Sequence, residues 1–409
     1  MKRFRKTIFW LHLIAGLVAG LSIAVMCLTG TALAFEKEIL AWAQRDARTV
    51  PAPAENTARL TLEQLQAKVH DAQPDFRLTS IVLQNDPRAA VAFPASARGA
   101  APIYANPYTG EVRPSAPTAV NGFMQSMNSW HRYLNFTGEV ARPRGRLING
   151  VSNLAFAFLA FSGLYLWWPR KWRTKGLRRS IVFVRAYGKA RDWNWHNVIG
   201  LYSAPVLIVL TITAIPISFQ WGGRVINTLT GTPEPAAGAA NGPAAPAAGA
   251  PPTAIVITPP VTGARPISQD ALVAIVQKDI PAWKTMTIAS PGGSGGRGGR
   301  SGTETTPQPA MVTVRTSDSW PRTVNLTLTL NPYTGEVLRR SGYADQAPAQ
   351  RVRAWTRYLH TGEALGFWGQ LVAGLACLGG CVLVYTGFAL SWRRFFIGKP
   401  TESPPSPIS

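Results

Sequence analysis

The sequence predicts a membrane protein with four transmembrane helices and two α+β domains outside the membrane, built from a duplicated unit of span, external domain, span. Three observations lead to this fold class. Apolar residues gather in four long blocks, basic residues flank these blocks, and three motifs occur twice in the same order. A large soluble protein is the alternative for 409 residues with 46% hydrophobic and 15% charged residues, but its apolar residues would be spread more evenly.

Each of the four apolar blocks is long enough to cross a bilayer. A helix needs about 20 apolar residues to cross a hydrocarbon core about 30 Å thick. The blocks carry no Asp, Glu, Lys or Arg in their interiors, where a charge costs ~2.5–3.5 kcal/mol. We place the transmembrane helices at residues 8–35, 140–168, 196–219 and 363–391.

The start of the first block also fits a secretory signal peptide, because small residues follow a basic and then an apolar stretch. A signal peptide has an apolar core of only about 7–15 residues. The longer apolar stretch therefore favours an uncleaved transmembrane helix.

Basic residues indicate the orientation, because Lys and Arg accumulate in short cytoplasmic loops. They precede the first span, follow the last, and fill a basic loop at residues 169–195, where Asp192 is the single acid. We therefore expect a multi-pass membrane protein with both termini cytoplasmic. The net charge of +22 also raises nucleic-acid binding, but contact with anionic membrane lipid explains basic residues beside spans more simply.

The chain repeats itself in three places. Residues 9–16 align with residues 193–200, so that His12 matches His196. The run Asn-Pro-Tyr-Thr-Gly-Glu-Val at 106–112 recurs at 331–337, and Trp130 to Leu134 aligns with Trp355 to Leu359. Three matches in the same order indicate a duplication.

The two external segments each have the pattern of an α+β domain. Residues 57–120 and 263–345 both show one amphipathic helix, several short β-prone runs and the repeated Asn-Pro-Tyr-Thr-Gly turn. Residues 232–262 are rich in Ala, Pro and Gly, and residues 290–302 in Gly, Ser and Arg. Neither composition can bury a core, so we expect linkers there.

The five histidines carry the candidate chemistry. His70 lies on the predicted helix of the first external domain, where we expect a solvated surface residue. The other four lie beside the spans and form two sets at two depths: the inner pair, His12 and His196, and the outer pair, His131 and His360.

Two neutral histidines that face each other can supply both axial nitrogens to a haem iron. We therefore predict two b-type haems, with all four residues as axial ligands of the iron. Gly16 and Gly200 lie one turn beyond the inner pair and would leave room for a porphyrin. The alternative is that these glycines only allow close helix packing.

The outer pair is less symmetric. His131 aligns with Thr356, whereas His360 comes four residues later, which leaves the pairing of His131 with His360 open. The alternative to haem ligation is hydrogen bonding at the membrane interface. Arg132 and Arg357 do align, and each is suited either to a haem propionate or to lipid phosphate.

The two Asn-Pro-Tyr-Thr-Gly-Glu-Val runs, His131-Arg132 before Thr137-Gly138-Glu139, and Leu359 to Glu363 resemble the PepSY-associated transmembrane family. This family includes iron-regulated inner-membrane proteins and siderophore reductases of Gram-negative bacteria, so the resemblance implies a location in the bacterial inner membrane. The resemblance implies two periplasmic PepSY-type domains and an oxidoreductase that reduces a ferric siderophore. It also implies an electron donor, either cytoplasmic or a membrane quinol, whose identity stays open together with the catalytic residues.

A different function class is a PepSY-type regulator of a periplasmic peptidase without redox activity. Hydrolases, phosphotransferases and nicotinamide enzymes lack their usual motifs in this sequence.

Overall fold

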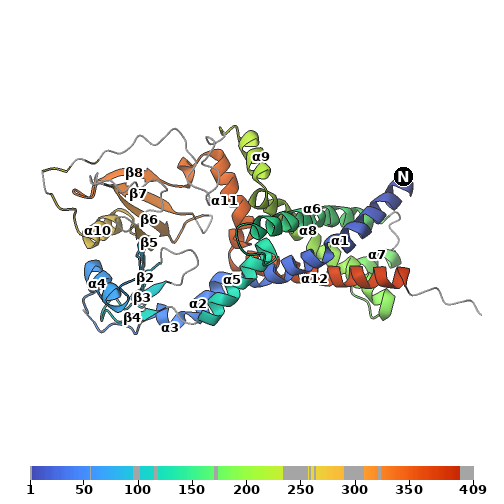
Figure 1. The fold of residues 1–409 in the computed structure, drawn as a ribbon, viewed down its shortest axis with the longest axis horizontal. Helices are drawn as coiled ribbons and strands as arrows, with labels where there is room; N and C mark the ends of the chain where they lie inside the picture. Colours follow the sequence, from blue (N-terminus) through green and yellow to red (C-terminus); the bar gives the residue numbers. More distant parts are fainter. Residues whose placement is uncertain are drawn as a thin grey trace, which may run out of the picture. The chain divides into compact units, whose positions relative to one another are not determined.

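A computed structural model describes residues 2–55, 57–94, 102–114, 118–169, 174–233, 257, 259–261, 264–289, 308–320 and 324–396. The chain divides into two compact units (Figure 1). The first comprises residues 1–35, 126–223 and 356–409, and the second comprises residues 36–125 and 224–355. The predicted linkers at 232–262 and 290–302 lie almost entirely outside the described residues.

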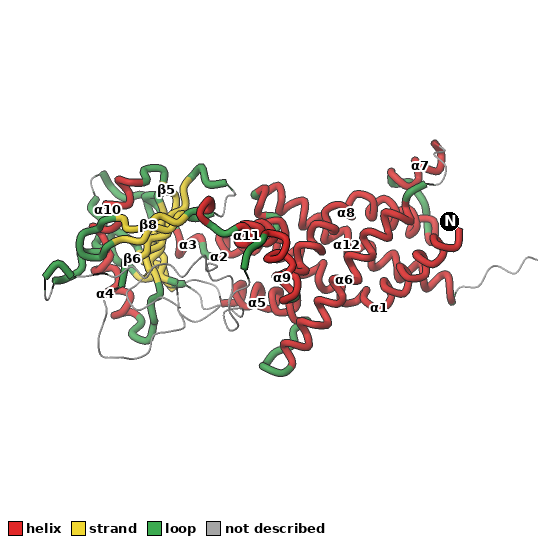
Figure 2. The backbone as a smooth tube through the Cα atoms, turned by 90° about the horizontal axis from the view of Figure 1, so that it is seen from above, coloured by secondary structure: helices red, strands yellow, loops and turns green. Residues whose placement is uncertain are grey.

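The first unit contains four helices that are long and apolar enough to span a membrane. They are α1 (Lys2–Ala34), α6 (Ala141–Trp167), α8 (Gly188–Ser218) and α12 (Phe367–Phe395). Helices α1 and α8 each pack against both α6 and α12, and the four run alongside one another in Figure 2. Large apolar side chains such as Val18 and Leu21 point out of the bundle, so the helices have the outward apolar surface that lipid contact requires.

Polar side chains on two of the four helices bind carbonyl groups at the ends of neighbouring helices. Gln370 donates to the carbonyl of Ala34 at the end of α1 (2.9 Å), and Arg146 donates to that of Ser218 at the end of α8 (3.0 Å). The last carbonyls of a helix have no partner within the helix. These contacts therefore satisfy groups that would be costly to leave unpaired in lipid.

The second unit is built on one antiparallel sheet of eight strands in the order β4-β3-β2-β1-β5-β6-β7-β8. The strands are β1 (Ser80–Gln84), β2 (Val91–Phe93), β3 (Ile103–Ala105), β4 (Val112–Pro114), β5 (Trp283–Ala289), β6 (Ala310–Thr316), β7 (Leu326–Leu330) and β8 (Val337–Ser341). The β-prone runs of the sequence correspond to these strands.

The two external segments contribute their strands to one common sheet. Strand β1 of the first segment pairs with β5 of the second, with Val82 opposite Thr287. Left apart, each strand would expose unpaired backbone groups at an edge. Their pairing removes two edges and gives the segments a common core.

Two helices cover one face of this sheet: α4 (Leu62–Ala72) and α10 (Gln269–Asp279). Leu65 of α4 and Val276 of α10 pack onto fully buried strand residues such as Phe93 and Met286. The carboxylate of Asp270 accepts a hydrogen bond from the backbone N–H of Leu62 (3.0 Å). A carboxylate at a helix N-terminus is favourable, so α10 also caps α4.

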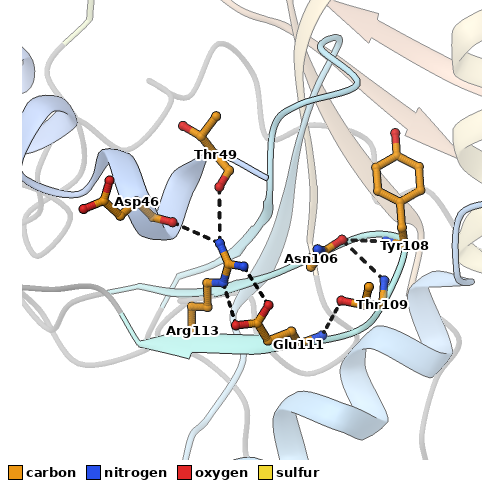
Figure 3. Close-up of polar contacts among 7 residues, drawn as sticks. All are labelled: Asp46, Thr49, Asn106, Tyr108, Thr109, Glu111 and Arg113. Atoms are coloured by element: carbon orange, nitrogen blue, oxygen red, sulfur yellow. Dashed lines mark hydrogen bonds and ion pairs between the residues drawn. The ribbon is translucent and has the colours of Figure 1, made fainter. Parts of the chain in front are cut away.

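The repeated Asn-Pro-Tyr-Thr-Gly run forms the same turn twice. The Asn106 side-chain oxygen accepts hydrogen bonds from the backbone N–H groups of Tyr108 (2.9 Å) and Thr109 (3.3 Å), and Gly110 follows with φ of +72° (Figure 3). Asn331 accepts in the same way from Tyr333 (2.9 Å), and Gly335 has φ of +74°. Only glycine adopts this conformation without strain.

The first copy of this turn has an additional anchor. Arg113 binds Glu111 with two hydrogen bonds and also reaches the carbonyls of Asp46 (3.1 Å) and Thr49 (3.3 Å) (Figure 3). The arginine therefore fixes the strand after the turn to the segment that follows α1.

Six shorter helices were not anticipated as separate elements. They are α2 (Glu36–Ala43), α3 (Arg45–Arg48), α5 (Thr118–Tyr133), α7 (Thr174–Ile181), α9 (Gln220–Thr230) and α11 (Pro348–His360). Helix α7 lies in the basic loop. Helices α5 and α11 precede α6 and α12 and carry His131 and His360, so the outer pair is not on the spanning helices themselves.

Candidate functional site

The inner pair lies between two spanning helices. His12 of α1 and His196 of α8 have ring centroids 6.5 Å apart, with ring planes at 82°. The Nδ1 atom of His12 lies 2.8 Å from Oγ of Ser162 on α6, and that of His196 lies 2.9 Å from Oγ1 of Thr386 on α12. Each imidazole is thus held by a hydroxyl from the neighbouring helix.

The outer pair lies at the ends of two short helices. His131 of α5 and His360 of α11 have ring centroids 6.2 Å apart, with planes at 51°. Nδ1 of His131 lies 3.0 Å from Oγ1 of Thr29 and 3.1 Å from the carbonyl of Met26, both on α1. Positions 12 and 29 of α1 are separated by about 25 Å of helical rise, so the two pairs occupy different depths of the bundle.

His360 is held in the same way as His131. Its Nδ1 atom lies 3.0 Å from the carbonyl of Leu210 and 3.3 Å from Oγ1 of Thr213, both on α8. The structure therefore brings together the two pairs that the sequence analysis named, and it leaves the fifth histidine, His70, exposed on α4.

These contacts determine which ring nitrogen is free. A carbonyl only accepts, so Nδ1 of His131 and His360 must carry the proton and donate it. In the inner pair, Oγ1 of Thr386 donates to the carbonyl of Val382 (2.8 Å) and Oγ of Ser162 to that of Leu159 (3.4 Å), which leaves these hydroxyls to accept from His196 and His12. All four histidines consequently keep the lone pair of Nε2 for another ligand.

The spacing of each pair fits one metal ion between two imidazoles. Two imidazoles that bind opposite sides of a metal at about 2 Å each have ring centres roughly 6 Å apart. The observed centroid separations of 6.5 and 6.2 Å match this arrangement. Hydrogen bonding of the second ring nitrogen to a protein oxygen is the usual support of a metal-bound histidine.

The set of donors fits haem better than a metal bound by protein alone. Within the described ranges, no group of three or more His, Cys, Asp or Glu side chains comes together as a metal site. A structural or catalytic zinc ion takes at least three protein ligands, whereas a haem iron takes its other four nitrogens from the porphyrin. Pairs of histidines are therefore sufficient for haem.

Glycines lie beside the two inner histidines. The Cβ of any larger residue at Gly163 would lie 3.5 Å from Cε1 of His12, and at Gly387 3.8 Å from Cε1 of His196. At Gly16 and Gly200, the glycines named from the sequence, a Cβ would meet leucine side chains at the ordinary distances of 3.8 and 3.6 Å. All four distances are ordinary van der Waals contacts, so close packing requires glycine at none of these positions.

Gly163 and Gly387 were not recognised from the sequence. Each directly follows the hydroxyl residue that holds an inner histidine, Ser162 or Thr386. The sequence signal is a hydroxyl residue followed by glycine, which occurs in span two as Ser162-Gly163 and in span four as Thr386-Gly387.

The outer histidines are held in their neutral form. Both residues are half-buried, and burial followed by the charge of neighbouring His360 lowers the pKa of His131 to about 4. Burial likewise lowers the pKa of His360. A neutral imidazole is the form that binds a metal, so both side chains are ready for ligation at neutral pH.

Asn149 was also missed. Its amide donates to the backbone carbonyl of His131 (2.7 Å). Leu134 and Asn135 follow with φ of +51° and +59°, so α5 ends abruptly and this carbonyl would otherwise have no helical partner. Arg132, which the sequence suggested as a propionate ligand, lies over the ring of Tyr133 at 5.3 Å, and both Arg132 and Arg357 are exposed.

A buried carboxylate lies one turn before His196. Asp192 is fully buried and pairs with Arg191 (2.8 Å) and Arg393 (3.3 Å). Because Arg393 is on α12, this ion pair joins α8 and α12 at the end of the bundle that carries the inner pair.

Comparison with known proteins gives one result for almost the whole chain. The family model described as the PepSY-associated TM region matches residues 9–394. No curated protein matches the chain.

Proposed function

Because the chain belongs to the PepSY-associated TM region family, we propose that it is a di-haem b-type cytochrome of the bacterial inner membrane that reduces a ferric siderophore in the periplasm. One observation carries this proposal. Four histidines form two pairs with the centroid spacing of axial ligands, and each keeps its Nε2 lone pair free.

The residues have defined roles in this proposal. His12 and His196 would hold one haem and His131 and His360 the other, while the hydroxyl and carbonyl partners of Nδ1 fix the imidazole orientation. A haem bound at each pair would supply one-electron chemistry, because its iron can be ferric or ferrous. The apolar bundle around the inner pair keeps water from the electron path.

The direction of transfer follows from the basic residues. We place the bundle end with Arg5, Arg179 and Arg393 in the cytoplasm, which puts the inner pair near an electron donor there or near membrane quinol. The outer pair and the eight-stranded sheet then belong to the periplasmic side. The aligned positions of His12 and His196, with equivalent contacts to Ser162 and Thr386, support a duplicated span–PepSY–span unit.

The reaction requires a single electron. A siderophore holds Fe(III) through hard oxygen donors, and one electron delivered at the haem that His131 and His360 would hold would convert it to Fe(II), which such donors bind less tightly. Reduction at the periplasmic face would therefore release the iron.

The direct test combines cofactor analysis with electron transfer. Protein from haem-replete cells should contain about two b-type haems per chain by pyridine haemochrome assay. After anaerobic reduction and removal of excess reductant, ferric siderophore should reoxidise the haem while a ferrous chelator captures Fe(II), and His360→Ala should abolish this.

Other outcomes would change the assignment. Folded but colourless protein would refute the cytochrome and favour the regulator of a periplasmic peptidase. Haem that every ferric chelate leaves reduced, yet that a periplasmic protein fraction reoxidises, would replace siderophore reduction by electron transfer between proteins.

A further inference from the structure

Three aromatic side chains lie together in the second half of the sheet unit, residues 224–355, and none of them belongs to the histidine pairs. Trp320 follows β6, and its ring centroid lies 6.4 Å from that of Trp355 on α11, with the planes at 64°. The indole N–H of Trp355 donates to the hydroxyl of Tyr343 (2.7 Å). We call Trp320, Tyr343 and Trp355 the aromatic cluster.

Arginines border this cluster. The guanidinium of Arg351 lies 6.0 Å from the centre of the Tyr343 ring, and its Nε donates to the carbonyl of Gln346 (3.0 Å). Arg353, on the same helix, donates to Oδ1 of Asn227. Aromatic rings and positively charged guanidinium groups therefore lie close together here.

The nearest carboxylates are engaged within their own turns. Asp345 accepts from the backbone N–H of Gly342 (2.8 Å). Asp318 is hydrogen bonded to Thr316, which lowers the pKa of its carboxyl. Each carboxyl group thus has a hydrogen-bond partner within its own turn.

Fold stability alone does not explain the cluster. Trp320 is 60% exposed, although a tryptophan that serves only the core would be covered. At the positions of the first half that align with Tyr343, Arg351 and Arg353, the chain has Thr118, Ser126 and Asn128. The second copy thus has a tyrosine ring and two cations where the first copy has uncharged polar side chains.

We propose that the aromatic cluster and Arg351 form a binding surface for an anionic aromatic iron chelate, a ferric catecholate. Catecholate rings stack on the indole of Trp320, and the negatively charged oxygens lie against the Arg351 guanidinium. A hydroxamate chelate lacks aromatic rings and gains little from this surface. The inference rests on the proposed function, which it narrows to one substrate class.

Trp355 of the aromatic cluster and His360 of the outer pair belong to the same helix, α11.

The test measures binding without electron transfer. Gallium(III) catecholate is redox-inert and has the shape and charge of the ferric complex, so its binding to the full chain in detergent can be measured by calorimetry. We expect saturable binding, weakened about tenfold by Trp320→Ala and by Arg351→Ala, and largely retained by Trp320→Phe. Gallium(III) hydroxamate should bind more weakly and respond to none of these changes.

Trp42 supplies a matched control, because it is also exposed (68%) and lies 5.1 Å from the guanidinium of Arg45 but is on α2. Trp42→Ala should leave catecholate binding unchanged. Equal binding of both gallium complexes, or equal losses in Trp42→Ala and Trp320→Ala, would overturn the inference. Such a result would not bear on the proposed haem content or on siderophore reduction. Conversely, colourless protein that still binds gallium catecholate would refute the redox function but not the binding surface.

Discussion

The inner and outer histidine pairs have nearly the same ring spacing but are built differently. His12 and His196 occupy aligned positions within spanning helices. His131 and His360 do not align, and they lie near the C-terminal ends of the short helices α5 and α11. The inner pair thus owes its ring spacing to two aligned positions of the repeat. The outer pair owes its similar spacing to the points at which α5 and α11 end.

The two pairs also differ in their hydrogen bonds. The contact that the structure gives Nδ1 of His12 is the hydroxyl of Ser162, whereas His131 and His360 each reach a hydroxyl and a backbone carbonyl. A carbonyl cannot be removed by changing a side chain. Backbone carbonyls therefore help to hold both outer histidines, whereas a single side-chain hydroxyl holds His12.

The largest expected effect is complete loss of one haem. His12→Ala and His196→Ala should each remove the inner haem, and His131→Ala and His360→Ala the outer haem, because a single imidazole leaves the iron without its second protein ligand. Haemochrome assays should give about half the haem of the unchanged protein in each variant. Depletion of a shared haem by His12→Ala and His131→Ala would show that the pairs are wrongly assigned.

The next effect concerns which side of the membrane each pair faces. A cysteine at Gly176 in α7, close in sequence to many basic residues, should resist a membrane-impermeant thiol reagent in intact spheroplasts. A cysteine at Gly242, in the predicted linker, should react. If Gly176→Cys reacted and Gly242→Cys did not, the inner pair would lie on the periplasmic side. The proposed direction of electron transfer would then be wrong.

A smaller effect should separate the two kinds of support. Ser162→Ala removes the hydroxyl that holds His12 and should weaken inner haem binding about 10–100-fold. Thr29→Val should weaken outer haem binding less, because the carbonyl of Met26 still accepts from His131. Haem transfer to apomyoglobin measures both, and equal losses would mean that the carbonyl contributes nothing.

The smallest effect is spectroscopic. The ring planes stand at 82° in the inner pair and 51° in the outer, and nearly perpendicular axial imidazoles make two iron d orbitals more equal in energy. The inner haem, isolated in His360→Ala, should therefore have the more anisotropic low-spin electron paramagnetic resonance signal. His12→Ala should show the less anisotropic one, and identical spectra would remove this distinction.

Several features followed from the sequence by itself because they depend on local rules. Uninterrupted apolar runs predicted four spanning helices, since a charge in the hydrocarbon core is costly. The Asn-Pro-Tyr-Thr-Gly run predicted both turns, which need only the Asn side chain and a glycine with positive φ. The alignment of His12 with His196 singled out a pair that the structure brings together.

Other features were decided only by the tertiary structure, because they join segments that no local pattern relates. The pairing of β1 with β5 merges the two external segments, and it arises from two strand edges that each segment alone would leave open. The approach of His131 to His360 depends on where α5 and α11 end, on the positive φ of Leu134 and Asn135, and on Asn149 binding the freed carbonyl. Neither contact has a period in the sequence: backbone pairing of two strands makes the first, and the ends of α5 and α11 make the second.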